Sequence, residues 1–234
     1  MSPRRPSSVR RPGGTDICQH AGRLVRHLLC VMLLAPVSNP AGAFTVSILN
    51  GPPKTLYLQV GVGGFTGIFP YYILGGVPGN NTTVNTESVA VPAAAVGNGT
   101  AQAMTTVSGV SASSYDGRAF CNVPAQLYIG GFYRTPGLGG GGSATVTATV
   151  PASLVDAAGD TLSFAQVSWT SGGGGDSGGE PFPAGSFSAG AVQTVGTIAQ
   201  NQWAESCWTF SYSNTTVPAA GTYTGRVLYT LTAP

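Results

Sequence analysis

The residues of this chain that could act as acids, bases or nucleophiles are few, and most of them stand alone. Both histidines, His20 and His27, lie near the start, so none follows residue 43. This excludes a Ser-His-Asp triad, a Cys-His dyad and a histidine-ligated metal site from the remainder of the chain. Seven acids remain there, and no two form a recognisable glycosidase pair: Glu87, Asp116, Asp156, Asp160, Asp176, Glu180 and Glu205. We therefore expect no enzyme activity and no catalytic residue.

Metal binding and a cofactor are not expected either. Asp176 and Glu180 lie in the glycine-rich stretch SGGGGDSGGEPFPAG, a setting that some calcium sites share. Two carboxylates without a repeated glycine-aspartate motif do not make up such a site. The stretch is interpreted as a flexible loop, because glycine loses the most backbone entropy on ordering.

Cys121 and Cys207 are the two cysteines that follow residue 43. In an exported chain an even pair of thiols is expected to form a disulfide, because the compartment is oxidising. Closing so long a loop would stabilise the fold by about 4 kcal/mol in the chain-entropy model. Two buried free thiols are the alternative.

Residues 1–43 have the features of an export signal. Arginines precede the apolar run 28–37, and Ala41 and Ala43 supply the small residues that a signal peptidase requires. The run is too short to cross a bilayer, so we expect cleavage before Phe44 and no transmembrane span. The predicted domains are a signal peptide, 1–43, and one β-sandwich domain, 44–234. The product is expected in the periplasm and then at the cell surface or outside the cell.

Without this leader the chain is weakly acidic. Four basic residues stand against the seven acids, which gives a net charge of −3; they are Lys54, Arg118, Arg134 and Arg226. No basic patch is left to neutralise phosphate groups. Nucleic acid is therefore not expected as a partner.

Short runs rich in valine, threonine and tyrosine alternate with clusters of glycine and proline, and no run of ten residues has helical spacing. This pattern predicts an all-β protein, and the number and spacing of the runs favour an antiparallel β-sandwich. The stretch 151–160 is a candidate for one helical turn. The expected strands are 44–49, 55–62, 83–91, 100–108, 125–133, 144–150, 162–169, 208–213 and the last run of the chain, with 191–198 as a weaker candidate.

Tryptophans can stack on sugars, but in strands they more often belong to the core. Trp169 and Trp208 stand at the ends of apolar strands and are expected to be buried. Trp203 lies in the polar stretch AQNQWAES and is expected to be partly exposed, as a surface aromatic for a glycan or another surface ligand. The apolar stretch 67–76, GIFPYYILGG, is either a buried strand or an exposed loop that touches a partner.

The last sixteen residues, AAGTYTGRVLYTLTAP, have the period of two of a β-strand. With its apolar alternation and Gly221 fourteenth from the end, this run resembles the C-terminal strand of fimbrial (pilus) subunits of the bacterial chaperone–usher pathway and of their spore-coat-U-like relatives. Its candidate assembly residues are Gly221, Tyr223, Val227, Tyr229 and Leu231.

The resemblance implies an incomplete immunoglobulin-like sandwich. In that family a periplasmic chaperone pairs with the last strand, and the N-terminal extension of the neighbouring subunit later replaces the chaperone by donor-strand complementation. The function that follows is that of a structural or adhesive subunit of a cell-surface fibre.

The run FTVSIL, 44–49, would be the matching donor strand, with Phe44, Val46 and Ile48 on one face. The donor run is short, which leaves a second interpretation open. In that interpretation it is the first strand of its own, complete sandwich, and the protein is a secreted carbohydrate- or surface-binding β module.

Overall fold

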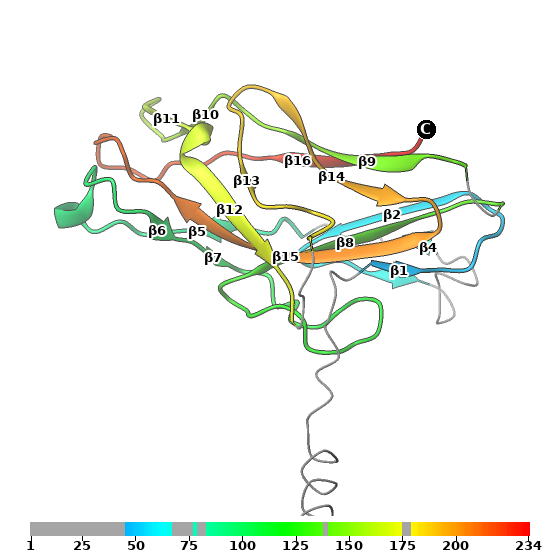
Figure 1. Cartoon of the computed structure of the whole chain (residues 1–234). Coiled ribbons are helices and arrows are strands. Elements are labelled where there is room, and N and C mark those ends of the chain that lie inside the picture. The colour runs from blue at the N-terminus through cyan, green and yellow to red at the C-terminus, as the bar shows by residue number, and fades with distance from the viewer. Residues whose placement is uncertain (1–44, 67–76, 79–82, 138–139, 175–178) are drawn as a thin grey trace, which may run out of the picture. The chain divides into compact units, whose positions relative to one another are not determined.

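Two antiparallel sheets pack face to face in the structure, which is a computed structural model (Figure 1). It describes residues 45–66, 77–78, 83–137, 140–174 and 179–234. All of these belong to one compact unit, Pro40–Pro234. The expected export signal, Phe44 and the apolar stretch 67–76 lie outside the described residues.

The larger sheet is built around one long strand, β15, in the order β13-β12-β15-β8-β2. β12 and β1 pair along one edge of β15, while β8 and β6 pair along the other. The strands are β1 (Thr45–Ser47), β2 (Thr55–Val60), β6 (Gln102–Ala103), β8 (Leu127–Arg134), β12 (Val167–Gly172), β13 (Gly185–Ser186) and β15 (Gln202–Tyr212).

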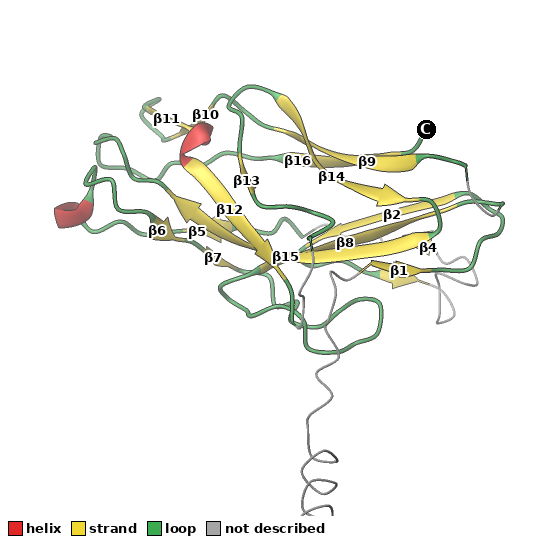
Figure 2. Ribbon diagram, viewed as in Figure 1, coloured by secondary structure: helices red, strands yellow, loops and turns green. Residues whose placement is uncertain are grey.

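The smaller sheet has three strands in the order β14-β9-β16, and Figure 2 shows it above the larger one. Its strands are β9 (Ser143–Thr149), β14 (Val192–Ala199) and β16 (Leu228–Thr232). Among the described residues, the remaining strands form three short pairs, and there are two single 3-10 turns. They are β3 (Phe65–Thr66) with β4 (Val77–Pro78), β5 (Glu87–Ser88) with β7 (Thr105–Thr106), β10 (Ser153–Val155) with β11 (Thr161–Ser163), η1 (Ala93–Ala95) and η2 (Phe164–Gln166).

The main core lies between the two sheets, because each strand turns alternate residues inward. The central strand of the smaller sheet contributes Ala144, Val146 and Ala148, all fully buried. They face aromatic and aliphatic side chains of the larger sheet, among them Ile129 and Trp208. The predicted all-β sandwich is therefore confirmed, and so is the burial of Trp169 and Trp208.

One side of the sandwich is closed by the segment 180–183, which the sequence did not mark. Phe182 is fully buried in the main core. Its carbonyl oxygen accepts hydrogen bonds from Ser171 Oγ at 2.6 Å and Trp208 Nε1 at 2.9 Å, and Trp169 Nε1 donates to the carbonyl of Pro183 at 2.9 Å. Residues 180–183 belong to the stretch interpreted as a flexible loop, but they pack against the core.

The outer face of the larger sheet carries a second layer. The loop between β7 and β8, the green loop below the sheet in Figure 1, covers part of this face. Tyr57, Phe132 and Trp203 form an aromatic cluster there with Ile48. Large side chains on both faces explain why every residue of β8 is buried.

Two local predictions differ from the structure. The stretch 151–160 forms no helical turn: it makes β10 and a tight turn into β11, in which Gly159 has a φ of +90°. The prediction that Trp203 is a partly exposed surface aromatic is wrong, because its exposed fraction is 0%. Its ring packs on Phe132, Tyr57 and Tyr115, with centroid distances of 5.6, 6.0 and 5.9 Å.

Asn214 is a buried polar residue that ties two distant loops together. It has a left-handed φ of 53° and an exposed fraction of 1%. Its Nδ2 donates to the carbonyl of Ala95 at 2.7 Å and to Asn98 Oδ1 at 3.0 Å, and its Oδ1 accepts from the N–H of Gly97 at 2.9 Å. All the hydrogen-bonding groups of this amide are thus used inside the protein.

Candidate functional site

The C-terminal strand β16 is an edge strand of the smaller sheet. It pairs with β9 in a regular antiparallel ladder in which Tyr229 faces Ala148 and Leu231 faces Val146. No other described strand forms a ladder with its second edge. A row of backbone N–H and C=O groups on that side is a template for an added strand.

Alternate residues of this strand rest on the core, as the period of two predicted. Val227, Tyr229 and Leu231 are half-buried and pack against the main core, whereas Leu228 is 61% exposed on the opposite face. The ring of Tyr229 lies 6.0 Å from that of Trp208. Burial raises the pKa of the Tyr229 phenol, and the charge of Glu87 raises it further, so this phenol is neutral at ordinary pH.

The strand that lies next to β16 is β2, the edge strand of the larger sheet. Cα atoms of the two strands approach within 8 Å of each other, but no ladder joins them. Leu56, Leu58 and Val60 of β2 are half-buried against the same core. The two unpaired edges therefore border an apolar seam, which we call the β2–β16 seam.

One end of this seam is tied by Lys54. Its Nζ donates to the carbonyl oxygen of Pro234 at 2.8 Å and lies 5.6 Å from the centre of the Tyr133 ring. The ammonium group thus links the residue before β2 to the end of the run that contains β16. Because Lys54 is exposed, the bond is in contact with water and is expected to be weak.

The first part of the candidate assembly run does not belong to the β16 ladder. Thr224 bridges to Val155, the last residue of β10, and Tyr223 donates its hydroxyl to the carbonyl of Ala219 at 2.9 Å. Gly221 is exposed beside Asp156. The structure therefore brings Val227, Tyr229 and Leu231 together at the seam and leaves Gly221 and Tyr223 elsewhere.

The candidate donor strand is seated in the sheet of its own chain. In β1, Val46 faces Trp203 and Ser47 faces Gln202 across an antiparallel ladder with β15. The pairing continues with the N–H of Ile48, which donates to the carbonyl of Asn201 at 2.8 Å. Ile48 is buried in the aromatic cluster of the outer face, with an exposed fraction of 8%.

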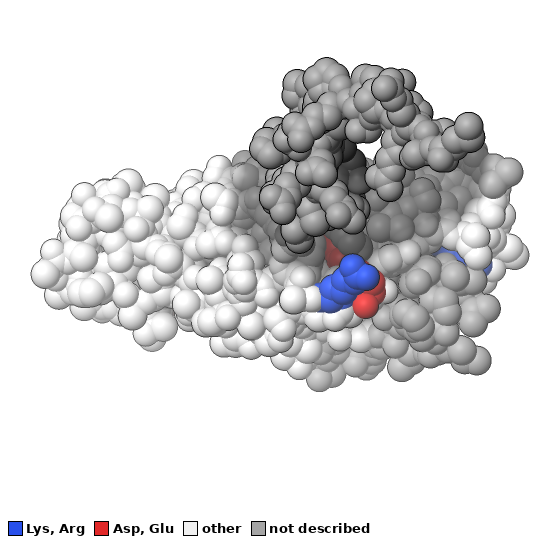
Figure 3. Space-filling view, turned by 60° about the horizontal axis from the view of Figure 1, so that its bottom comes forward, with Lys and Arg blue, Asp and Glu red and all other residues white. Residues whose placement is uncertain are grey.

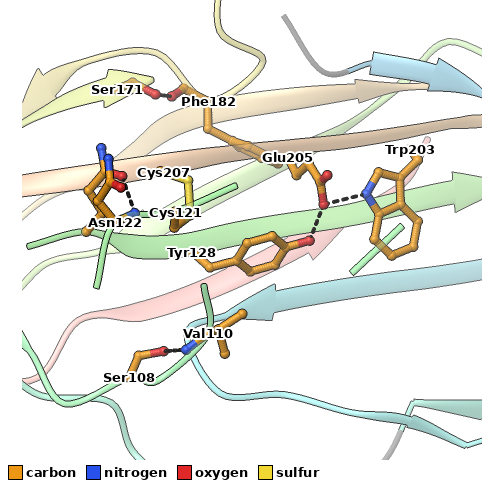
Figure 4. Close-up of a disulfide and its surroundings, with 11 residues drawn as sticks. Ser108, Val110, Cys121, Asn122, Tyr128, Ser171, Phe182, Trp203, Glu205 and Cys207 are labelled. Atoms are coloured by element: carbon orange, nitrogen blue, oxygen red, sulfur yellow. Dashed lines mark hydrogen bonds between the residues drawn. A yellow bond between two sulfur atoms is a disulfide. The ribbon is translucent and has the colours of Figure 1, made fainter. Parts of the chain in front are cut away.

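The expected disulfide is present between Cys121 and Cys207, with a Cα–Cα distance of 5.6 Å, which is usual for such a bond. Cys207 lies on the outer face of β15, and Cys121 lies within the loop that covers this face. The bond fixes that loop to the middle of the larger sheet (Figure 4).

Next to the disulfide lies a buried acid that the sequence did not single out. Glu205 has an exposed fraction of 0%, and its Oε2 accepts hydrogen bonds from Tyr128 Oη at 2.5 Å and Trp203 Nε1 at 3.0 Å (Figure 4). Its Oε1 has no hydrogen-bond partner. Burial raises the pKa of Glu205, while its polar neighbours Ser113, Tyr128 and Trp203 lower it by less.

Glycine makes room for this arrangement. Glu205 and Gln59 both face Gly130, the residue between them on β8. A Cβ at Gly130 would collide with the Tyr128 hydroxyl, so the missing side chain lets the phenol lie across the strand toward Glu205. Gln59 in turn accepts from Tyr57 Oη at 2.6 Å and from Ser114 Oγ at 3.1 Å.

Charged groups are sparse on the described surface, and Figure 3 shows a face that carries few of them. The described residues contain one ion pair, Arg118 with Asp116 at 3.5 Å, and Arg118 is largely exposed. No group of three or more His, Cys, Asp or Glu residues in the described ranges could hold a metal ion. No helix within them is long and apolar enough to cross a membrane.

Comparisons with known proteins assign no relative to this chain. No protein-family model matches it, and no curated protein or solved structure matches it either. The proposals below therefore depend on the geometry and chemistry of the chain itself.

Proposed function

We propose that this protein is a non-enzymatic structural or adhesive subunit of a cell-surface fibre, exported and then assembled by strand donation. The observation that carries the proposal is the one-sided pairing of β16. Tyr229 and Leu231 of this strand and Val227 just before it rest on the core, while the second backbone edge of β16 is unpaired by any described strand. Main-chain pairing at such an edge gives affinity, and the alternate pockets give specificity.

Strand addition at β16 requires the β2–β16 seam to open. A strand that pairs with both edges needs them about 9.6 Å apart, two strand spacings, and the Cα atoms here approach within 8 Å. The bond from Lys54 to Pro234 would break in the same step. A periplasmic chaperone is the partner that would hold the seam open, and a neighbouring subunit the one that would fill it.

The donated strand in this proposal is 44–49, which has to leave β15. Val46 and Ile48 then lose their present neighbours and enter the seam of the next copy. Deletion of residues 44–49 tests this. The truncated protein is expected to keep a cooperative thermal transition and to stay monomeric, while the intact protein forms larger oligomers in light scattering.

A chain of equal length, with Val46 and Ile48 replaced by serine, is the matched control and should also fail to assemble. Two outcomes would refute the fibre proposal. One is the loss of the cooperative transition on truncation. The other is an intact protein that remains a stable monomer without a chaperone.

The pairing of β1 with β15 of its own chain favours a second candidate function. Its ladder with β15 and the burial of Ile48 are what a complete sandwich requires of its first strand. A protein of this kind needs no donated strand. It would act as a secreted carbohydrate- or surface-binding module.

A further inference from the structure

The outer face of the smaller sheet is an array of hydroxyl groups. Along the central strand β9 the inward residues are buried, so Thr145 and Thr147 point outward. Thr147 faces Thr194 of β14 on one side and Thr230 of β16 on the other. Thr145 faces Thr197 and Thr232 in the same way, so two rows of three threonines cross the sheet.

The spacing of this array is set by the sheet. Neighbouring threonines in a row are about 4.8 Å apart, and the two rows about 6.8 Å apart, because the residue between them faces the core. A bulge in β14 between Thr194 and Gly196 shifts the register by one residue, so that Thr197 faces Thr145. The row beyond consists of Val192, Thr149 and Leu228, all three of them exposed.

A pocket adjoins this face along the edge of β14. Its volume is about 500 Å³, within the usual range for a site that takes a small molecule. Thr194 and Thr197 belong to both the array and the pocket wall, so the two are continuous. The wall also includes Ser143, Gln202, Glu180 and the ring of Pro181.

The chemistry of this surface selects a class of ligand. Each hydroxyl donates and accepts a hydrogen bond, and the Gln202 amide does both as well. The outward positions of β9, β14 and β16 carry no charged residue. Among the described residues, the pocket wall carries one carboxylate, Glu180, and no cation. Such a surface suits an uncharged ligand rich in hydroxyl groups and disfavours an anionic one.

We infer that the threonine face and its pocket bind a neutral polysaccharide, with one sugar residue in the pocket and the following ones along the threonine rows. The proposal does not depend on assembly into fibres. Thr45 of β1 also lines the pocket, so the site is complete when β1 is seated on β15.

Affinity electrophoresis of the mature protein tests this inference. The native gels contain dextran, mannan or hydroxyethylcellulose as neutral polymers and dextran sulfate as the anionic one. Retardation by at least one neutral polymer and none by dextran sulfate is expected. Thr147→Val and Thr194→Val remove a hydroxyl but keep a side chain suited to a strand, and each should weaken retardation about fivefold, as the loss of one hydrogen bond predicts.

The matched control is Thr161→Val, at an exposed threonine of β11 away from this face, which should bind as the unchanged protein does. Thermal melts of all variants establish that they are folded. Failure of every neutral polymer to retard the protein overturns the inference. It is also overturned if the Thr147→Val and Thr194→Val variants are retarded as strongly as the unchanged protein. Fibre formation is scored separately by light scattering on the same samples, so either proposal can fail without the other.

Discussion

The phenol of Tyr128 reaches Glu205 on the neighbouring strand by lying across Gly130, the residue that faces Glu205. This places a carboxyl group with one unpartnered oxygen in a site that water does not reach. A buried donor or acceptor that loses its partner costs about 1–3 kcal/mol. Tyr128→Phe should therefore lower the free energy of unfolding by about that amount in urea titrations, whereas Tyr223→Phe, which removes the hydrogen bond of a less buried phenol, should change it little.

The pH dependence of stability provides a second check on Glu205. Burial raises its pKa above the ordinary value of 4.5, so the folded chain binds this proton more tightly than the unfolded chain does. Its contribution to stability is complete below about pH 4.5 and is lost as the pH rises through the folded pKa. Glu205→Gln should therefore gain stability relative to the unchanged protein as the pH is raised.

Burial also raises the pKa of Glu87, so the stability of the unchanged protein and that of Glu205→Gln both fall for this reason as the pH rises. The quantity to measure is therefore the difference between their unfolding free energies at each pH. Parallel curves from acid to neutral pH would show that Glu205 titrates as it does in the unfolded chain.

The disulfide should contribute about 4 kcal/mol to the free energy of unfolding, because it closes a loop with a sequence separation of 86 residues. Replacing Cys121 and Cys207 by serine together should lower the urea midpoint accordingly. Alkylation of the unreduced, unfolded protein should label neither Cys121 nor Cys207. Labelling of two thiols per chain would contradict the bond.

Opposite faces of β16 should respond differently to a charge. Leu231→Asp places a carboxylate against the main core and is expected to prevent folding, since an unpaired charge cannot be buried there. Leu228→Asp, three residues earlier and 61% exposed, is the matched control and should fold. Circular dichroism melts of the two variants compare them directly, and equal melting temperatures would refute the assignment of the faces.

Phe182 should behave as a core residue although it lies in a loop. Phe182→Ala is expected to cost about 3–5 kcal/mol, the usual range for a buried phenylalanine. Val192→Ala, at a residue 67% exposed, should have almost no effect. A small effect of Phe182→Ala would mean that the segment 180–183 leaves the sandwich at little cost.

The sequence predicted the strands well where apolar and polar residues alternate, as in β9 and β16. It failed for Trp203, because the pattern around it is polar and the rings that bury it, Tyr57, Tyr115 and Phe132, come from other segments of the chain. It also missed Phe182, which stands between Pro181 and Pro183. One apolar residue in such a setting has no periodicity, and its burial follows from the tertiary fold alone.

The threonine face was equally hidden, because each of its strands reads as an ordinary half-exposed strand. Only the register of β9 with β14 and β16 shows that their hydroxyls align in rows. The position of β1 is a similar case: the pattern of FTVSIL does not say which strand it pairs with, and only the register with β15 shows this.

Asn214 begins the sequence Asn-Thr-Thr, which is an acceptor for N-linked glycans in eukaryotic secretion. Its amide nitrogen is occupied by Ala95 and Asn98 in the folded protein, so a glycan can be attached there only before folding and would then keep these loops apart. Production in yeast or mammalian cells is thus expected to yield misfolded material unless the acceptor is removed. Thr216→Ala removes it, at the expense of a hydrogen bond from Gln166, and leaves Asn214 itself unchanged.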